Sequence, residues 1–177
     1  VTNALGLPRP ITGGFASVYE LHTSSGRWAV RCFLRDFSDQ QTRYNLIASH
    51  LQNHRLPYLV QFEYLRSGIR VQGSLFPILK MQWIEGKPLN KYIEEHLTNA
   101  SELEMIEKRW GHVLGELKKA RIGHGDLQHG NVLALPSGEL RLIDYDGMWV
   151  PALDGMGSHE VGHSAYQNPK RTERDFH

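Results

Sequence analysis

The chain has 177 residues, enough for one sizeable core or two small lobes, and 40% of them are hydrophobic and 22% charged, as in ordinary globular proteins. The charges are interspersed and leave a net charge of +1, which gives no support for a nucleic-acid or membrane partner. The single cysteine, Cys32, excludes a disulfide framework and a multi-cysteine metal site, and no apolar run reaches the roughly 18 residues of a membrane span, so we expect a cytoplasmic protein.

The first third of the chain is predicted to consist mainly of strands around one helix. Phe15–Leu21 alternates between apolar and polar residues, and Arg27–Leu34 follows it after a short turn, so the two predict a hairpin behind the loop Gly13-Gly14. Apolar residues at helical spacing predict a helix over about Ser38–Asn53. Two further strands are expected at Tyr58–Leu65 and Leu75–Ile84.

A cluster of helix and strand breakers, Glu85-Gly86-Lys87-Pro88, follows the last of these strands. We interpret it as the boundary between a first lobe, residues 1–85, and a second lobe, residues 86–177. The second lobe is predicted to hold an amphipathic helix over Leu89–Leu97 and a longer one over Ser101–Ala120, which Ser101 and Glu104 would begin as a capping box. Together these elements predict an α+β fold in two lobes.

The rest of the second lobe is predicted to be a short hairpin followed by loop. Its strands are expected at Val132–Leu135 and Leu140–Ile143, and the Gly-, His- and Pro-containing residues 144–177 favour irregular structure.

Three polar side chains around this hairpin carry the strongest chemical signal. Asp126 precedes the hairpin, Asn131 follows five residues later, and Asp144 lies where the second strand ends. A hairpin returns the chain to its start, so we expect Asp144 to lie beside Asn131. Two carboxylates and an amide oxygen suit a hard cation such as Mg²⁺, and phosphoryl transfer needs both such a cation and a carboxylate that accepts a proton.

The motifs around these residues resemble the protein-kinase-like superfamily, in particular uncharacterised bacterial kinase-like domains of the eukaryotic type. The loop His-Gly-Asp-Leu-Gln-His-Gly-Asn at residues 124–131 is similar to the kinase catalytic loop, and Leu-Ile-Asp-Tyr-Asp-Gly at 142–147 to the strand that enters the metal-binding motif. Residues 13–19, 28–31 and 80–86 resemble the Gly-rich loop, the strand with the nucleotide-binding lysine, and the adenine-binding hinge.

The resemblance implies a bilobal kinase-like fold that binds ATP and Mg²⁺, with an N-lobe of antiparallel sheet plus one helix and a mostly helical C-lobe that is truncated here. It implies a catalytic base at Asp126, metal ligands at Asn131 and Asp144, and Arg31 in the place of the catalytic lysine. The positions that it implies for the nucleotide are Gly13, Gly14, Val18, Ala29, Arg31, Met81, Gln82 and Ile84.

Several residues depart from the kinase pattern at positions that turnover usually needs. Arg31 stands where the family has lysine, Gln128 stands where it has the lysine of the catalytic loop, and the predicted helix Ser38–Asn53 contains no glutamate. Gly125 replaces the arginine of the loop, as in aminoglycoside and choline kinases, and Asp146 replaces the glycine of the metal motif. A working phosphotransferase acting on protein hydroxyls, a nucleotide-binding pseudokinase and a small-molecule kinase therefore all stay open.

Two further expectations concern the C-terminal third. The sequence His159-Glu160-Val161-Gly162-His163 matches the zinc-protease pattern H-E-x-x-H, but its glycines disfavour the helix which that site requires, so we expect a coincidental match. Kinase C-lobes continue for several helices beyond this point, so we expect the partners to include an additional C-terminal segment or domain of the same protein, besides a protein substrate or signalling partner.

Overall fold

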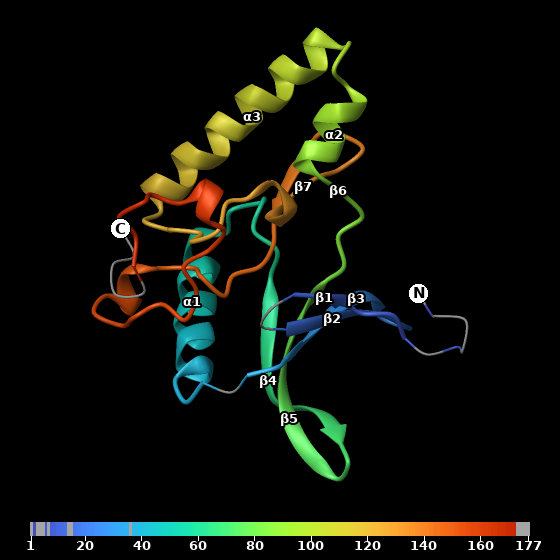
Figure 1. Cartoon of the computed structure of the whole chain (residues 1–177), viewed down its shortest axis with the longest axis vertical. Helices are drawn as coiled ribbons and strands as arrows, with labels where there is room; N and C mark the ends of the chain where they lie inside the picture. The colour runs from blue at the N-terminus through green and yellow to red at the C-terminus, as the bar shows by residue number, and fades with distance from the viewer. Residues whose placement is uncertain (1, 3–5, 7, 14–15, 36, 173–177) are drawn as a thin grey trace. The chain divides into compact units, whose positions relative to one another are not determined.

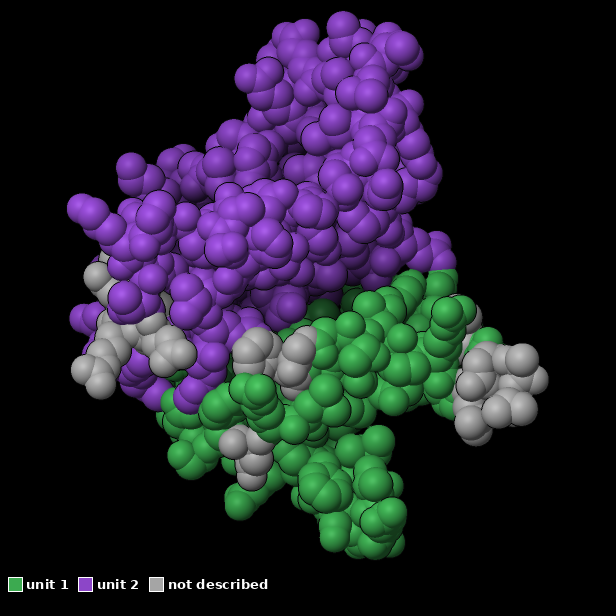
Figure 2. Space-filling view, viewed as in Figure 1, with its two compact units in different colours: residues 1–48, 61–83 green, residues 49–60, 84–177 purple. Residues whose placement is uncertain are grey.

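The computed structural model describes residues 2, 6, 8–13, 16–35 and 37–172, and it shows the expected α+β fold (Figure 1). The chain divides into two compact units, which Figure 2 distinguishes by colour. Unit 1 comprises Val1–Ala48 and Gln61–Trp83, and unit 2 comprises Ser49–Val60 and Ile84–His177. No described helix is both long enough and apolar enough to cross a bilayer.

Unit 1 is built on a five-stranded antiparallel sheet with the strand order β1-β2-β3-β5-β4. Short turns join β2 to β3 and β4 to β5, whereas the chain between β3 and β4 leaves the sheet to form a helix. The strands are β1 (Ile11–Thr12), β2 (Ala16–Thr23), β3 (Gly26–Phe33), β4 (Phe62–Val71) and β5 (Ser74–Gln82).

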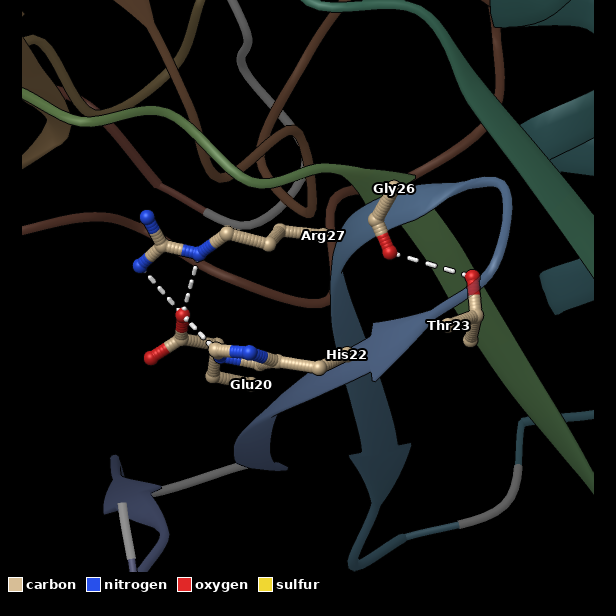
Figure 3. Close-up of polar contacts among 5 residues, drawn as sticks. All are labelled: Glu20, His22, Thr23, Gly26 and Arg27. Atoms are coloured by element: carbon tan, nitrogen blue, oxygen red, sulfur yellow. Dashed lines mark hydrogen bonds and ion pairs between the residues drawn. The ribbon is translucent and has the colours of Figure 1, made fainter.

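The β2–β3 hairpin is closed by a turn and by a charge cluster along its strands (Figure 3). Thr23 Oγ1 donates to the carbonyl of Gly26 at 3.0 Å, and Gly26 takes a positive φ of 126° that a side chain would disfavour. Glu20 accepts hydrogen bonds from Arg27 Nε at 2.7 Å and from His22 Nε2 at 2.8 Å. Arg27, and to a lesser degree His22, hold the pKa of the Glu20 carboxyl below its ordinary value.

Helix α1 (Gln40–His54) supplies the aromatic centre of unit 1. Tyr44 is 4% exposed, and its ring centre lies 5.8 Å from that of Phe33 and 5.6 Å from those of Phe62 and Tyr64. The helix ends because Arg55 adopts a left-handed φ of 48° while its N–H still bonds to Leu51 at 2.9 Å, which is a common way to terminate a helix.

Unit 2 combines two helices with a three-stranded antiparallel sheet of order β6-β7-β8. The helices are α2 (Leu89–Glu95) and α3 (Ala100–Lys119), and the strands are β6 (Lys87–Pro88), β7 (Val132–Ala134) and β8 (Leu140–Leu142). The described part of the unit also contains the short 3₁₀ helices η1 (His129–Asn131), η2 (Pro151–Leu153) and η3 (Ser164–Tyr166).

The core of unit 2 draws on one face of α3, on the hairpin and on the chain that follows it. Ile106, Val113 and Leu117 are spaced so that they share one face of α3, and all three are buried. The residues with no exposed surface come from β8 and the following segment: Leu142, Tyr145, Met148, Val150 and Leu153. The segment after the hairpin, although irregular, is therefore part of the core of unit 2, and its Trp149 pairs with Gly123 just before the loop of residues 124–131.

Three sequence-based expectations about local structure were wrong. The strand expected from Tyr58 begins only at Phe62. The breaker residues Lys87 and Pro88 form the short strand β6, because they pair with β7 far along the chain. Helix α3 is capped by Asn99, whose side chain accepts from the N–H of Glu102 at 3.2 Å, rather than by a capping box that starts at Ser101.

Candidate active site

The loop of residues 124–131 connects α3 to β7 and carries the proposed base. Gly125 turns the chain with a φ of +84°, and the N–H of Asn131 bonds to the carbonyl of Gln128 at 3.0 Å to close the one-turn helix η1. The loop is held at both ends, because Gly123 just before it pairs with Trp149 and β7 begins directly after it at Val132.

Hydrogen bonds within this loop hold the carboxylate of Asp126. Asn131 Nδ2 donates to Asp126 Oδ2 at 2.8 Å and to the Asp126 carbonyl at 2.9 Å, and Gln128 Nε2 donates to Oδ2 at 2.9 Å. Both acceptors of the Asn131 amide require its nitrogen on the Asp126 side, so its oxygen points the other way. The geometry leaves Asn131 with an oxygen ligand for a cation and orients Asp126 at the same time.

Asp144 is brought to this loop by the hairpin. Val132 pairs with Leu142, and the N–H of Ile143 bonds to the carbonyl of Asn131 at 3.0 Å, so Asp144 follows directly after a residue bonded to Asn131. Asp144 itself takes a left-handed φ of 66°, which asparagine and aspartate tolerate better than most residues. The structure therefore brings together the three polar residues that the sequence singled out.

Two further carboxylates lie beside Asp144. Ligand oxygens of Asp144, Asp146 and Glu160 all lie within 4.8 Å of one another, and all three residues are partly buried. Carboxylate oxygens are the ligands that hard cations such as Mg²⁺ prefer, so the type of donor fits the metal that the kinase resemblance implies. Sequence reasoning noted Asp146 only as a departure and Glu160 only within H-E-x-x-H. A contact between loops leaves no spacing signal that could have identified the pair.

A buried histidine packs against the residues that follow β8 and anchors the start of the loop. His124 is 2% exposed, its Nε2 bonds to the carbonyl of Ile143 at 3.0 Å, and its ring packs edge-on against Tyr145. Burial lowers the pKa of His124, and the Asp144 charge only partly opposes that shift. A neutral imidazole with its proton on Nε2 satisfies the bond to Ile143, so His124 acts as a structural donor.

The absence of an arginine at position 125 has a steric reason. A Cβ on Gly125 would lie 1.9 Å from the carbonyl oxygen of Gly147. The two segments of the chain are held together there by the hydrogen bonds between Gly123 and Trp149 at 2.7 and 3.0 Å. The glycine of the metal motif comes one residue late, at Gly147, and this glycine packs against Gly125. The glycine at position 125 and the shifted glycine at position 147 depart from the kinase pattern together, because the two residues pack against each other.

The positions expected to contact the nucleotide lie in unit 1, with one exception. Val18 pairs with Arg31 and Ala29 pairs with Met81, and alternation along β3 puts Ala29 and Arg31 on one face, so these four side chains share a face of the sheet. Gln82 follows at the end of β5 and pairs with Trp28.

The remaining expected nucleotide contacts are distributed differently. Gly13 precedes β2, and its N–H bonds to Ala16 at 2.9 Å. Gly14 lies outside the described residues. Ile84 belongs to unit 2.

The H-E-x-x-H sequence does not form a zinc-protease helix. Residues 159–163 are irregular, Glu160 joins the carboxylate cluster, and His163 Nδ1 accepts from the N–H of Ala165 at 3.2 Å. The two histidines therefore lack the one-turn helical spacing that would present both to a single ion.

The chain is similar to a curated protein of the kinase-like superfamily. The chain is 26% identical over 140 residues to the EKC/KEOPS complex subunit BUD32 of Gibberella zeae, which covers 65% of this chain and 53% of that protein. The chain therefore spans about half the length of the curated relative that it matches. No family model matches the chain. The similarity to BUD32 supports a place for the chain in the kinase-like superfamily.

Proposed function

We propose that this chain is a kinase-like phosphotransferase that binds ATP and Mg²⁺ and transfers the γ-phosphate to a protein hydroxyl of the Ser/Thr type. The observation that carries the proposal is the hydrogen bonding at Asp126, where Asn131 and Gln128 orient the carboxylate on a loop that adjoins Asp144. A base on this loop, with an amide oxygen and a second carboxylate at the two ends of the β7–β8 hairpin, suits phosphoryl transfer.

Asp126 would accept the proton of the attacking hydroxyl. As the new bond from the hydroxyl oxygen to the γ-phosphorus forms and the bond to the bridging oxygen of ATP breaks, the hydroxyl proton passes to the Asp126 carboxylate and ADP leaves with the electron pair. General-base assistance of this kind contributes about 10²–10⁴-fold to a rate. Fixed donors on Oδ2 would keep the carboxylate from rotating away from the hydroxyl.

Asn131 and Asp144 would hold the metal ion, with Asp146 and Glu160 as neighbouring carboxylates. A divalent cation bound there supplies charge neutralisation to the phosphates of ATP. The contribution of the chain is a group of oxygen ligands fixed by the β7–β8 hairpin on one side and by residue 160 on the other.

We propose that the shared sheet face of unit 1 binds the nucleotide. Val18, Ala29 and Met81 would contact the adenine ring, with Met81 in the gatekeeper place, and Arg31 would supply a cation to the phosphates. The backbones of Gln82 and Ile84 would bond the adenine edge, and Gly13 with Gly14 would let N–H groups approach the phosphates.

A protein partner is part of the proposal. The similar protein from Gibberella zeae is named as a subunit of a complex. We propose that this chain also works on or with another protein, either as a substrate or as a signalling partner, because it combines a kinase-like loop with a similarity to a complex subunit.

A nucleotide-binding module without turnover is the second candidate. Helix α1 contains no acidic residue that could pair with Arg31 as the family glutamate does, and Gln128 directs its amide to Asp126 rather than a positive charge to the phosphate. Removing a positive charge near the developing phosphoryl transition state usually costs several kcal/mol. These two features favour binding without transfer.

The test combines nucleotide binding with phosphate transfer. Calorimetry with ATP, with and without Mg²⁺, should show metal-dependent binding to the wild type that Asp144→Asn weakens by roughly 10-fold or more. Transfer of labelled γ-phosphate to the chain itself or to proteins of a cell extract should fall by about 10²–10⁴-fold in Asp126→Asn, with ATP binding retained.

The outcomes separate the candidates. Absence of ATP binding under every condition would contradict both nucleotide functions. Binding without transfer would favour the non-catalytic module, and transfer to small molecules alone would favour an enzyme of the aminoglycoside or choline type.

A further inference from the structure

A segment far along the chain contacts the candidate catalytic loop. The N–H of His163 donates to Asp126 Oδ1 at 2.8 Å, and Gln167 Nε2 and Arg171 Nη1 donate to the carbonyl of Gly125 at 2.8 and 2.5 Å. Arg171 Nη1 also donates to Gln167 Oε1 at 2.5 Å, which ties the two side chains together. We call the residues Gly162, His163, Gln167 and Arg171 the loop clamp.

The clamp adds a third hydrogen bond to the Asp126 carboxylate. A carboxylate offers about four acceptor sites on its two oxygens. Gln128 and Asn131 take two sites on Oδ2, and the N–H of His163 takes one on Oδ1. The remaining acceptor site therefore belongs to Oδ1, the oxygen that the clamp holds, and a substrate hydroxyl would have to use it.

The contact depends on a glycine. Gly162 has a φ of +81°, and a Cβ on it would lie 2.3 Å from Gln167 Nε2, 2.6 Å from the carbonyl oxygen of Gly125 and 3.0 Å from Asp126 Oδ1. The Gln167 side chain could rotate away, but the Gly125 carbonyl is backbone, so a side chain at this position would break the Gln167 contact and push the segment away from the loop. Gly155 has nearly the same φ, +79°, but a Cβ there would meet nothing within 4 Å.

Arg171 brings positive charge to a place where the loop cannot carry its own. Gly125 has no room for a side chain because of Gly147, so the loop itself cannot place an arginine there. The guanidinium of Arg171 instead reaches the Gly125 carbonyl from the segment of residues 162–171. Burial lowers the pKa of Arg171, and the charge of Asp126 opposes part of that lowering. A guanidinium remains charged in proteins, so this cation is permanent.

We infer that Gly162, Gln167 and Arg171 are positioning residues for the proposed reaction: they act through His163 N–H and the Gly125 carbonyl to fix the Asp126 carboxylate so that one acceptor site on Oδ1 stays available for the substrate hydroxyl. The inference rests on the proposed function, because it assigns the clamp a part in the transfer step. It also implies that turnover requires residues 162–171 to stay in contact with the loop.

The decisive comparison is Gly162→Ala against Gly155→Ala in the full chain. Both variants carry the same backbone penalty, but only the first places a methyl group against the loop. Hydrogen exchange of the His163 amide, followed by NMR, should become at least roughly tenfold faster in Gly162→Ala and stay unchanged in Gly155→Ala, since exchange reports the opening of that bond. In Gly162→Ala, kcat should fall by roughly 10- to 100-fold with the KM for ATP nearly constant, as expected for a misplaced base.

A second pair of variants guards against a folding defect in the first. Arg171→Met removes the charge and both hydrogen bonds of Nη1, whereas Arg171→Lys keeps the charge. We expect a lower kcat in Arg171→Met, partial recovery in Arg171→Lys, and ATP binding by calorimetry close to the wild type in both.

Each outcome of these experiments either supports or overturns the inference or the proposed reaction. Unchanged exchange of the His163 amide in Gly162→Ala, or an unchanged kcat in both Gly162→Ala and Arg171→Met, would overturn the inference. A higher kcat would overturn it as well, because it would mean that the segment blocks the base. A wild type that binds ATP without transferring phosphate would instead overturn the proposed reaction, and the amide exchange would still report whether the clamp exists.

Discussion

The hydroxyl of Tyr145 joins two backbone groups inside the core of unit 2. It accepts from the N–H of Val60 at 2.7 Å and donates to the carbonyl of Leu142 at 2.8 Å, and the side chain is fully buried. Tyr145→Phe should lower the free energy of unfolding by about 1–3 kcal/mol, because it leaves a buried N–H without an acceptor. Urea titration measures the change. The control is Tyr166→Phe, whose hydroxyl bonds to His129 at the surface and should cost less than about 0.5 kcal/mol.

Gly125 and Gly73 separate the cost of a backbone conformation from the cost of a clash. Both have a positive φ, +84° and +87°, but a Cβ on Gly125 would meet the backbone of Gly147 whereas one on Gly73 would meet nothing within 4 Å. Gly73→Ala should cost about 1–2 kcal/mol from φ alone. Gly125→Ala should cost about 1–3 kcal/mol more from overpacking. Equal losses of unfolding free energy would show that Gly147 yields easily and would remove the steric reason for the missing arginine.

The start of α3 is the point at which sequence and structure make different predictions for a mutant. Asn99 accepts from the N–H of Glu102, while Ser101 lies in the first turn and is exposed. Asn99→Ala should therefore lower the unfolding free energy by about 1 kcal/mol. Ser101→Ala should change it by less than about 0.5 kcal/mol. The reverse order of the two losses in thermal or urea unfolding would restore the capping box.

The elements that were predicted well are those in which apolar residues repeat at helical or strand spacing within the element itself. Helix α1 was expected at Ser38–Asn53 and lies at Gln40–His54, since its apolar spacing is local. The segment from Tyr58 to Val60 misled the prediction because its residues are as apolar as a strand. They are buried for another reason: the carbonyl of Tyr58 accepts from the N–H of Leu142 at 2.8 Å, a single bridge to β8 that no local pattern encodes.

The candidate site divides in the same way. The sequence predicted the proximity of Asn131 and Asp144, because one hairpin connects them and its strand pattern is local. It did not predict Glu160 beside Asp144 or Arg171 at Gly125, since loops that meet 16 to 46 residues apart leave no period in the chain. Such contacts depend on the packing of the irregular segment after β8, which is settled only by the complete core of unit 2.

At the scale of the whole molecule, stability should depend on pH through the buried histidine of unit 2. Burial lowers the pKa of His124 below its ordinary value of 6.5, and Asp144, the Ile143 carbonyl and Asp126 only partly offset the shift. Well above pH 6.5 the imidazole is neutral in both the folded and the unfolded chain, so it adds no pH dependence there. Below that pH the unfolded chain binds a proton that the folded chain refuses, so the free energy of unfolding falls as the pH falls toward the folded-state pKa.

We expect the free energy of unfolding to fall with decreasing pH in the wild type and to fall less steeply in His124→Asn. A single proton taken up only by the unfolded chain changes the free energy of unfolding by up to about 1.4 kcal/mol per pH unit. Urea titrations from pH 7 to pH 5 should therefore show a smaller loss of stability in His124→Asn than in the wild type, although the variant starts lower because it loses the bond to Ile143. His112→Asn, at an exposed position of α3, should keep the wild-type slope. Parallel curves for wild type and His124→Asn would mean that His124 has the same pKa in the folded and the unfolded chain, which would contradict the lowering of its pKa by burial.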